Sequence, residues 1–163
     1  MRTIHTLEGT EEVIDRRSAG MVAQQSGALF ESQCAYEFNQ QDICTTRRPT
    51  FYCHYGLKRK GDFLIHLPDK QIHVECKQLG DVHSHFDKLS HCLLNVINGC
   101  YGKHFWLIYD YAKDISLSRK KKIFLLIDEC KRIKDLMLGQ GITFELIHFE
   151  DIKQHLDKLK GGV

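Results

Sequence analysis

Apolar and small side chains recur at intervals of three and four along residues 21–39, which is the spacing of one face of a helix. The stripe consists of Gly27, Phe30, Cys34 and Phe38. Glu31 falls almost at the centre of this stripe when the residues are placed at the angular step of a helix. Because burying a carboxylate without partners costs free energy, we expect Glu31 to meet a cation, a metal ion or a water-filled cleft.

A hairpin pattern follows in the stretch GDFLIHLPDKQIHVECKQ, residues 61–78. Residues 62–67 and 71–78 have the composition of strands, and proline and aspartate favour a tight turn between them. In the second strand, alternation separates Ile72, Val74 and Cys76 from His73, Glu75 and Lys77. We expect the first set to face the core and the second set to carry chemistry.

The register of this hairpin decides which face receives Asp62. A turn over residues 68–70 brings Asp62 level with Cys76, between Glu75 and Lys77, and gives it the face of Cys76. A slip or bulge of one residue turns Asp62 to the other face. The sequence leaves both registers open, but in either one two carboxylates and a lysine gather at one end of the hairpin.

The remaining pattern alternates helices and strands. It predicts a short strand and then a basic loop over 44–60, helices over 81–99, 118–138 and 151–161, and strands over 103–110 and 142–150. Gly99 is expected to end the first of these helices, Asp151 to cap the last, and Trp106 to lie in the core. Strands that alternate with helices after an initial hairpin predict an α/β domain whose mixed sheet is packed on both faces.

Composition places the chain among ordinary globular proteins, with 163 residues, 42% hydrophobic and 27% charged, and we expect a single domain over 1–163. No apolar stretch approaches the ~20 residues of a membrane span, and residues 1–17 carry acids where a signal peptide has an apolar centre. The seven cysteines are odd in number and are not spaced as in a disulfide-bonded framework, so we expect them to be free thiols. These features predict a cytoplasmic protein.

The pattern closest to a zinc site consists of Cys44, Cys53 and His54, but it lacks a second closely spaced pair of ligands.

Asp62 and Glu75 together offer the hard oxygen ligands that suit Mg2+. A bound ion of this kind polarises a phosphate and lowers the pKa of a bound water. Lys77 could orient or deprotonate that water, and Glu31 could hold a second ion directly or through water. The set therefore suits metal-assisted hydrolysis of a phosphodiester. The alternatives are an exposed ion pair between Glu75 and Lys77, and a Glu31 carboxylate that only forms a salt bridge.

Three short motifs stand in order: GALFE at 27–31, GDF at 61–63 and VECKQ at 74–78, followed by a helix and an apolar strand. In this order they resemble the core of the PD-(D/E)xK nuclease superfamily, over residues 27–110. The resemblance implies a restriction-endonuclease-like αβββαβ core over about 21–110, with an extra strand and helix in the extension 111–163.

For the site, the resemblance implies metal ligands at Asp62 and Glu75, a catalytic lysine at Lys77 and an accessory carboxylate at Glu31. Gln78 matches a glutamine found in part of the superfamily. The literal Pro-Asp pair of this chain is Pro68-Asp69. A turn residue cannot easily reach the face that Glu75 and Lys77 share, so we expect Asp62 to be the functional aspartate and Asp69 to be a turn former.

A net charge of +2 is too small to indicate a nucleic-acid binder by itself, and a basic cluster alone is most simply a solvated face. The basic residues expected near the site are Arg47, Arg48, Lys58, Arg59 and Lys60. The last three immediately precede Asp62, where a DNA backbone would have to pass, so contact with phosphates is favoured there. The segment 119–122 suits a substrate-facing edge and a solvated helix end equally well.

The sequence therefore predicts a Mg2+-dependent deoxyribonuclease, an endonuclease in which Mn2+ could substitute. Cutting both strands of a duplex needs two copies of so small a chain, which predicts a homodimer or a larger homo-oligomer. The alternative is a non-catalytic DNA-binding or assembly module that keeps a nuclease-like fold. His83, His85 and His91 are expected to line the helix beside the cleft rather than to bind a metal ion.

Overall fold

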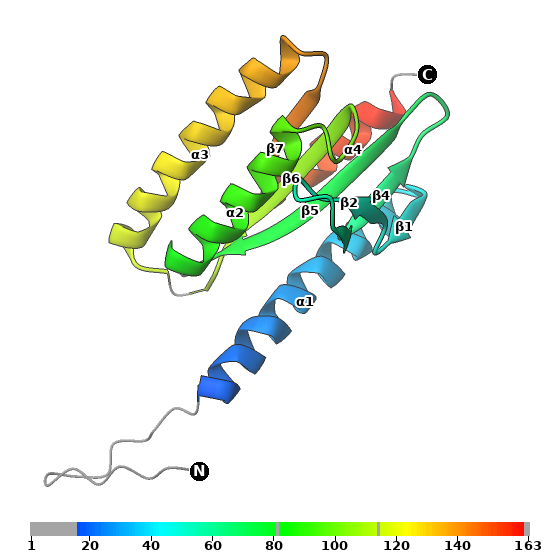
Figure 1. Cartoon of the computed structure of the whole chain (residues 1–163). Helices are drawn as coiled ribbons and strands as arrows, with labels where there is room; N and C mark the ends of the chain where they lie inside the picture. The colour runs from blue at the N-terminus through cyan, green and yellow to red at the C-terminus, as the bar shows by residue number, and fades with distance from the viewer. Residues whose placement is uncertain (1–15, 81, 114, 162–163) are drawn as a thin grey trace, which may run out of the picture.

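A mixed sheet of five strands, in the order β1-β4-β5-β6-β7, forms the centre of the computed structural model (Figure 1). The structure describes the backbone of residues 16–80, 82–113 and 115–161. It describes side chains for residues 27–80, 87–113 and 115–161. The strands are β1 Thr45–Arg47, β4 Phe63–His66, β5 Gln71–Leu79, β6 His104–Tyr111 and β7 Thr143–His148. β1, β4 and β5 pair antiparallel, whereas β5, β6 and β7 pair parallel. The predicted α/β class and mixed sheet are confirmed.

Helices cover both faces of this sheet. They are α1 Arg16–Gln40, α2 Val82–Ile97, α3 Leu117–Leu138 and α4 Ile152–Lys160. Figure 1 shows α2 and α3 side by side on one face, while α1 and α4 lie on the other. α1 is longer than predicted, and its first turns extend beyond the sheet (Figure 1). No helix in the described part of the chain is long and apolar enough to cross a membrane.

The alternation along β5 sends its side chains into two separate cores. Ile72, Val74 and Cys76 pack with Phe30, Cys34 and Phe38 of α1, as the helical stripe predicted. Leu79 points to the opposite face, where it joins the core formed by α2 and α3. Both faces of β5 are therefore packed, so Glu75 does not stand on an open surface. Its exposed fraction is 7%.

Residues 50–60 differ from the predicted strand and basic loop. β2 (Thr50–Tyr52) and β3 (Lys58–Lys60) form a separate antiparallel ribbon, with Phe51 opposite Arg59. The basic stretch is thus a strand, and its three side chains remain exposed. Phe51 anchors the ribbon, because it is buried against the core beside α2. Tertiary packing, which the local pattern does not reveal, fixes this segment.

The hairpin adopts the shifted one of the two registers that the sequence left open. Phe63 pairs with Val74, and the amide of Leu67 donates to the carbonyl of Lys70 at 2.9 Å. The turn therefore has two central residues, Pro68 and Asp69, rather than three. Asp62 consequently stands level with Glu75 and not with Cys76.

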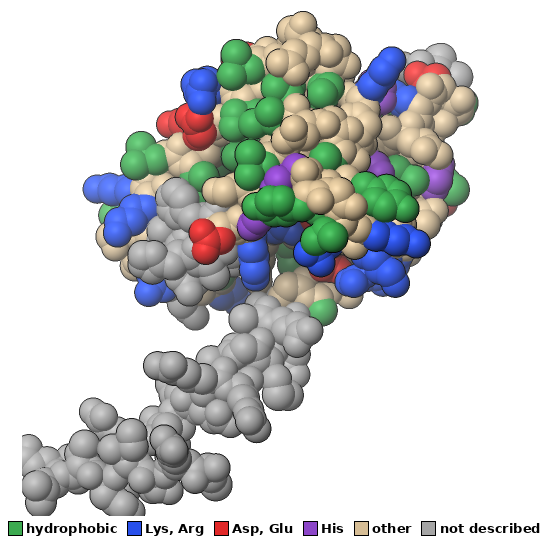
Figure 2. Space-filling model, viewed as in Figure 1, with side chains coloured by type: hydrophobic (Ala, Val, Ile, Leu, Met, Phe, Trp, Pro, Cys, Tyr) green, Lys and Arg blue, Asp and Glu red, His purple; other side chains and the backbone are tan. Residues whose placement is uncertain are grey.

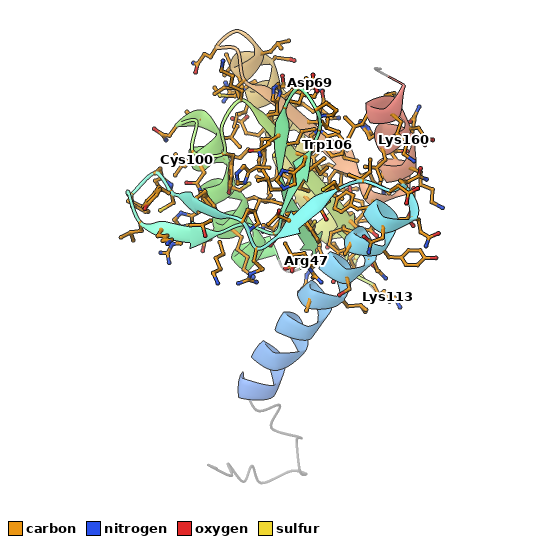
Figure 3. All side chains as sticks on the ribbon, turned by 90° about the vertical axis from the view of Figure 1, so that its right-hand side faces the viewer. Arg47, Asp69, Cys100, Trp106, Lys113 and Lys160 are labelled. Carbon is orange, nitrogen blue, oxygen red and sulfur yellow. The ribbon has the colours of Figure 1, made fainter. Side chains whose placement is uncertain are left out.

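Asp69 and Arg47 lie at opposite ends of the antiparallel strands (Figure 3). Asp69 lies in the β4–β5 turn, as predicted, and so is remote from the region where Arg47 pairs with Phe63.

The predicted cap of α4 is not observed: Asp151 precedes α4 but makes no capping hydrogen bond through its side chain. The short 3-10 helix Phe149–Asp151 starts instead from His148, whose ring accepts a hydrogen bond from the amide of Glu150.

Close packing at the end of β5 predicts that Gly80→Ala lowers the stability of the protein. A Cβ atom at Gly80 would lie 2.6 Å from the Cβ of Ala112, so strand or loop backbone would have to move. We expect the free energy of unfolding in urea to fall by about 1–3 kcal/mol. Gly27→Ala is the matched control, since a Cβ atom added at this position of α1 would meet no atom within 4 Å. That change should raise stability by about 0.5–1 kcal/mol through helix propensity. Equal effects of both substitutions would contradict the packing argument.

Candidate active site

Three charged side chains meet where β4 begins and β5 runs beside it. The Nζ atom of Lys77 lies 2.8 Å from Oε2 of Glu75 and 3.7 Å from Oδ2 of Asp62. The exposed fractions of Asp62 and Glu75 are only 9% and 7%, so both carboxylates are withdrawn from solvent. Three of the four predicted catalytic residues are therefore in one cluster.

Backbone contacts fix the position of Asp62. Its Oδ2 accepts a hydrogen bond of 2.7 Å from the amide of Cys76, and its carbonyl accepts one of 3.0 Å from the amide of Arg48. Gly61 gives the neighbouring Glu75 carboxylate its space, because a Cβ atom there would lie 3.2 Å from Oε1. The close approach of the Glu75 carboxylate thus explains why a residue without a side chain precedes Asp62.

The charges of this cluster are strongly coupled. Burial raises the pKa of the Glu75 carboxyl to about 7; the Lys77 ammonium opposes that rise, and the Asp62 carboxylate adds to it. Burial acts to lower the pKa of Lys77, but Glu75 and Asp62 outweigh it and hold this pKa above its usual value. Lys77 is therefore a fixed cation, while Glu75 can gain or lose a proton near neutrality.

Glu31 lies within electrostatic range of the cluster. Burial raises the pKa of this half-buried carboxyl, and the charge of Asp62 adds to the rise. Lys77, Arg48 and Arg47 act in the opposite direction. Glu31 is thus near Asp62, but within the described residues no three His, Cys, Asp or Glu side chains form a group arranged to hold a metal ion.

A pocket of about 350 Å³ opens beside Glu75 and Lys77. It lies between β5, α2 and the β2–β3 ribbon, on the face of the sheet that carries these two side chains. The cations that share its lining with Lys77 are Arg59, Lys60 and Lys88. Lys58 belongs to the same strand as Arg59 but does not line the pocket.

The other predicted residues lie around this site. Arg48 is joined to Asp62 through its backbone, and the guanidinium carbon of Arg47 lies 5.5 Å from the centroid of the Phe63 ring. Gln78 is half-buried and, by the alternation of β5, lies on the face of Cys76, away from the pocket. The lysine cluster at the start of α3 is not part of the pocket lining.

The contact between Asn95 and His54 at this pocket was not predicted from the sequence. Oδ1 of Asn95 accepts hydrogen bonds from the amide of His54 at 3.0 Å and from its ring Nδ1 at 2.8 Å. The two residues are 41 positions apart, and no periodicity or motif links them. The His91 ring stacks on His54 at a centroid distance of 5.7 Å. The side chains of His83 and His85 lie outside the described residues.

The donor set fits a hard divalent cation. Mg2+ is commonly held by one or two carboxylates, with waters and substrate phosphate completing the shell, so Asp62 and Glu75 would be enough protein ligands for such an ion. Neighbouring thiols are poor competitors, because soft sulfur ligands do not suit a hard cation such as Mg2+. Burial also raises the pKa of Cys76 and of Cys92.

Comparisons with known proteins give little context. No protein-family profile matches the chain, and no curated protein matches it. One solved crystal structure, of a protein of unknown function, matches with a TM-score of 0.35 and 12% identity. The match covers 71% of this chain and 55% of that one. At that TM-score, the likeness carries no argument about fold or function.

The raised pKa of Glu75 predicts a pH-dependent stability in the presence of chelator. Its folded-state pKa of about 7 exceeds the ordinary value of 4.5, so the folded protein binds the extra proton between these values. This contribution is complete below about pH 4.5 and is lost as the pH rises through about 7. Its size is on the order of 3 kcal/mol.

Glu75→Gln, which has no proton to lose at this site, supplies the control. Unfolding by urea at a series of pH values should show the stability of the wild type falling relative to the variant as the pH approaches 7. A difference between the two proteins that stays constant with pH would show that Glu75 does not titrate as its burial requires.

Proposed function

We propose that this protein is a metal-dependent deoxyribonuclease, an endonuclease of the PD-(D/E)xK type, that uses Asp62, Glu75 and Lys77. The observation that carries the proposal is the position of the Lys77 ammonium, 2.8 Å from Glu75 and 3.7 Å from Asp62, at a pocket lined by further cations. A buried pair of carboxylates beside one lysine is costly as a purely structural device. It is useful where a divalent cation and a phosphate have to meet.

The order of elements supports this proposal. α1 is followed in the main sheet by the antiparallel strands β1, β4 and β5, then by α2 and the parallel strand β6. This order agrees with the αβββαβ core that the sequence resemblance implies, apart from the inserted β2–β3 ribbon, and α3, β7 and α4 follow it. The resemblance assigns the metal ligands to Asp62, which immediately precedes β4, and to Glu75 on β5, and the lysine to Lys77 on β5. The proximity of these three side chains supports the proposal.

Each side chain has a distinct role in the proposed reaction. Asp62 and Glu75 would hold Mg2+, or Mn2+ in its place, which when bound supplies Lewis acidity at the scissile phosphate and an activated water. Lys77 would orient the attacking water and offset the negative charge that develops on the phosphate. Glu31 would support a second ion through water, and Gln78 remains an accessory residue on the other face of β5.

Basic side chains on two sides of Asp62 would contact the DNA backbone. Arg59 and Lys60 line the pocket itself, and Arg47 and Arg48 lie close enough to influence Glu31. Lys58 extends the same exposed strand. Contacts of this kind position a nucleic acid without reading its sequence.

A homodimer follows if both strands of a duplex are cut, because one copy offers one cluster of this type. Large apolar side chains exposed on α3, among them Phe124 and Leu125, offer a surface that a second copy could cover. The competing function is a DNA-binding or assembly module without activity. The buried carboxylates argue against it, since binding alone has no need of them.

Matched aspartate variants test the nuclease. Supercoiled plasmid, linear duplex, a four-way junction and single strands are incubated with Mg2+, with Mn2+ or with chelator. Asp62→Asn should lower the cleavage rate by about 100-fold or more while leaving DNA binding intact. Asp69→Asn, at the hairpin turn, should cleave like the wild type.

Lys77→Ala should lose cleavage in the same assay, and its thermal unfolding is followed to confirm that it folds. Cleavage by the wild type that survives chelator or Lys77→Ala would exclude the proposed mechanism. Binding without metal-dependent cleavage of any of these DNAs would favour the non-catalytic module.

The salt dependence of DNA binding tests the basic ribbon. Replacing Arg59 and Lys60 together by alanine should reduce the slope of log affinity against log salt by about 2, because two phosphate contacts are lost. Replacing Lys131 and Lys153, exposed on α3 and α4 and outside the pocket lining, should leave the slope unchanged. Equal slopes for both double variants in an anisotropy titration would contradict the assignment.

A further inference from the structure

Aromatic rings form one side of the pocket beside Glu75 and Lys77. The ring of His54 packs on that of Tyr55 with a centroid distance of 4.0 Å, and His91 stacks on His54 from α2. Tyr55 stays 68% exposed although it lines the pocket, so its ring offers free surface. Histidine, apolar and basic side chains gather on this face of the molecule (Figure 2).

Asn95 holds the His54 ring in one orientation and one tautomer. The backbone amide of His54 can only donate, so the Asn95 atom that it meets must be the oxygen Oδ1. The same oxygen meets Nδ1, which therefore carries a proton. In the neutral ring, Nε2 consequently presents a lone pair. This atom is buried and has no hydrogen-bond partner in the described part of the chain.

The depth of the site restricts what can reach it. The side chains of Lys77 and Glu75 are 21% and 10% exposed, and a volume of about 350 Å³ is near the lower end for ligand pockets. A phosphodiester must therefore enter between the ribbon and α2 to touch them. In a paired duplex the bases are stacked inside and the backbone is held against them, whereas a single strand can insert one nucleotide and leave its base free to stack.

We propose that this pocket binds one nucleotide of single-stranded DNA, with the base stacked on the exposed ring of Tyr55, which the His54 ring supports from behind. The inference rests on the proposed nuclease function and narrows its substrate to single strands or unpaired segments. Aromatic platforms combined with cations are the usual means of holding single strands. Arg59, Lys60 and Lys88 supply the cations here. Cutting a single strand needs one copy of the cluster, so this substrate removes the need for a dimer.

Binding in chelator, where no cleavage occurs, tests the pocket separately from the chemistry. Labelled oligonucleotides of one mixed sequence are titrated by fluorescence anisotropy as single strands and as the perfect duplex. We expect the single strand to bind more tightly. Tyr55→Leu should weaken its binding by about tenfold, as loss of one stacked base does. His54→Ala should weaken it in the same direction, because it removes the ring on which Tyr55 packs.

Two variants control for the general effects of substitution. Tyr55→Phe keeps the ring and should bind like the wild type. Tyr52→Leu removes a tyrosine that is equally exposed on the same ribbon but does not line this pocket, and it should also leave binding unchanged. Thermal unfolding of each variant shows whether it is folded.

Cleavage with Mg2+ is then measured on the same two substrates. Faster cutting of the single strand, reduced by Tyr55→Leu, supports the inference. Cutting of the duplex with equal or greater rate, unaffected by Tyr55→Leu, overturns it while the nuclease proposal stands. If neither substrate is cut, the nuclease proposal fails. Single-strand binding that is weakened by Tyr55→Leu would then still support the inference that the pocket binds a nucleotide. Single-strand binding that is unchanged by Tyr55→Leu would overturn that inference.

Discussion

The Lys77 ammonium is held against two carboxylates that the fold has largely removed from water. Taking such charges out of solvent costs several kcal/mol per ion, and one cation offsets only one of two anions. Burial is the main reason that the pKa of Glu75 rises to about 7, and the negative charge of Asp62 adds to the rise. An added proton or an added cation would therefore stabilise the site. The hydrogen bond from the Cys76 amide to Asp62 and the one from Lys77 to Glu75 hold the three side chains in place.

The strands of this site could be predicted because their pattern is local. Alternation along 71–78 places Glu75 and Lys77 on one face whatever the rest of the chain does. The register could not be fixed in the same way, since two-residue and three-residue turns around Pro68 fit the sequence equally well. A difference of one residue moves Asp62 from the level of Cys76 to that of Glu75, and only the observed pairing of Phe63 with Val74 decides it.

The pocket, by contrast, depends on contacts between distant segments. Phe51 draws the short β2–β3 ribbon against the core beside α2, and that position brings Arg59 to the site. His54 owes its orientation to Asn95, which lies on another element and shares no sequence pattern with it. Strands of three residues carry too little periodicity to be distinguished from loops. The sequence therefore reveals the charged cluster but not the walls that enclose it.

The segments that enclose the pocket affect the chemistry of the site as well as the access of a substrate to it. A phosphodiester is an anion, and the Asp62–Glu75–Lys77 cluster carries a surplus negative charge whenever Glu75 is ionised. The two repel each other in this small pocket unless positive charge is added. Arg59, Lys60 and Lys88 meet part of this need at the pocket lining, but none of them lies within ion-pair distance of the two carboxylates among the described contacts. A divalent cation between carboxylate and phosphate would supply the remainder at the point where the repulsion is strongest. Charge balance thus supports the proposed metal dependence in addition to the residue types.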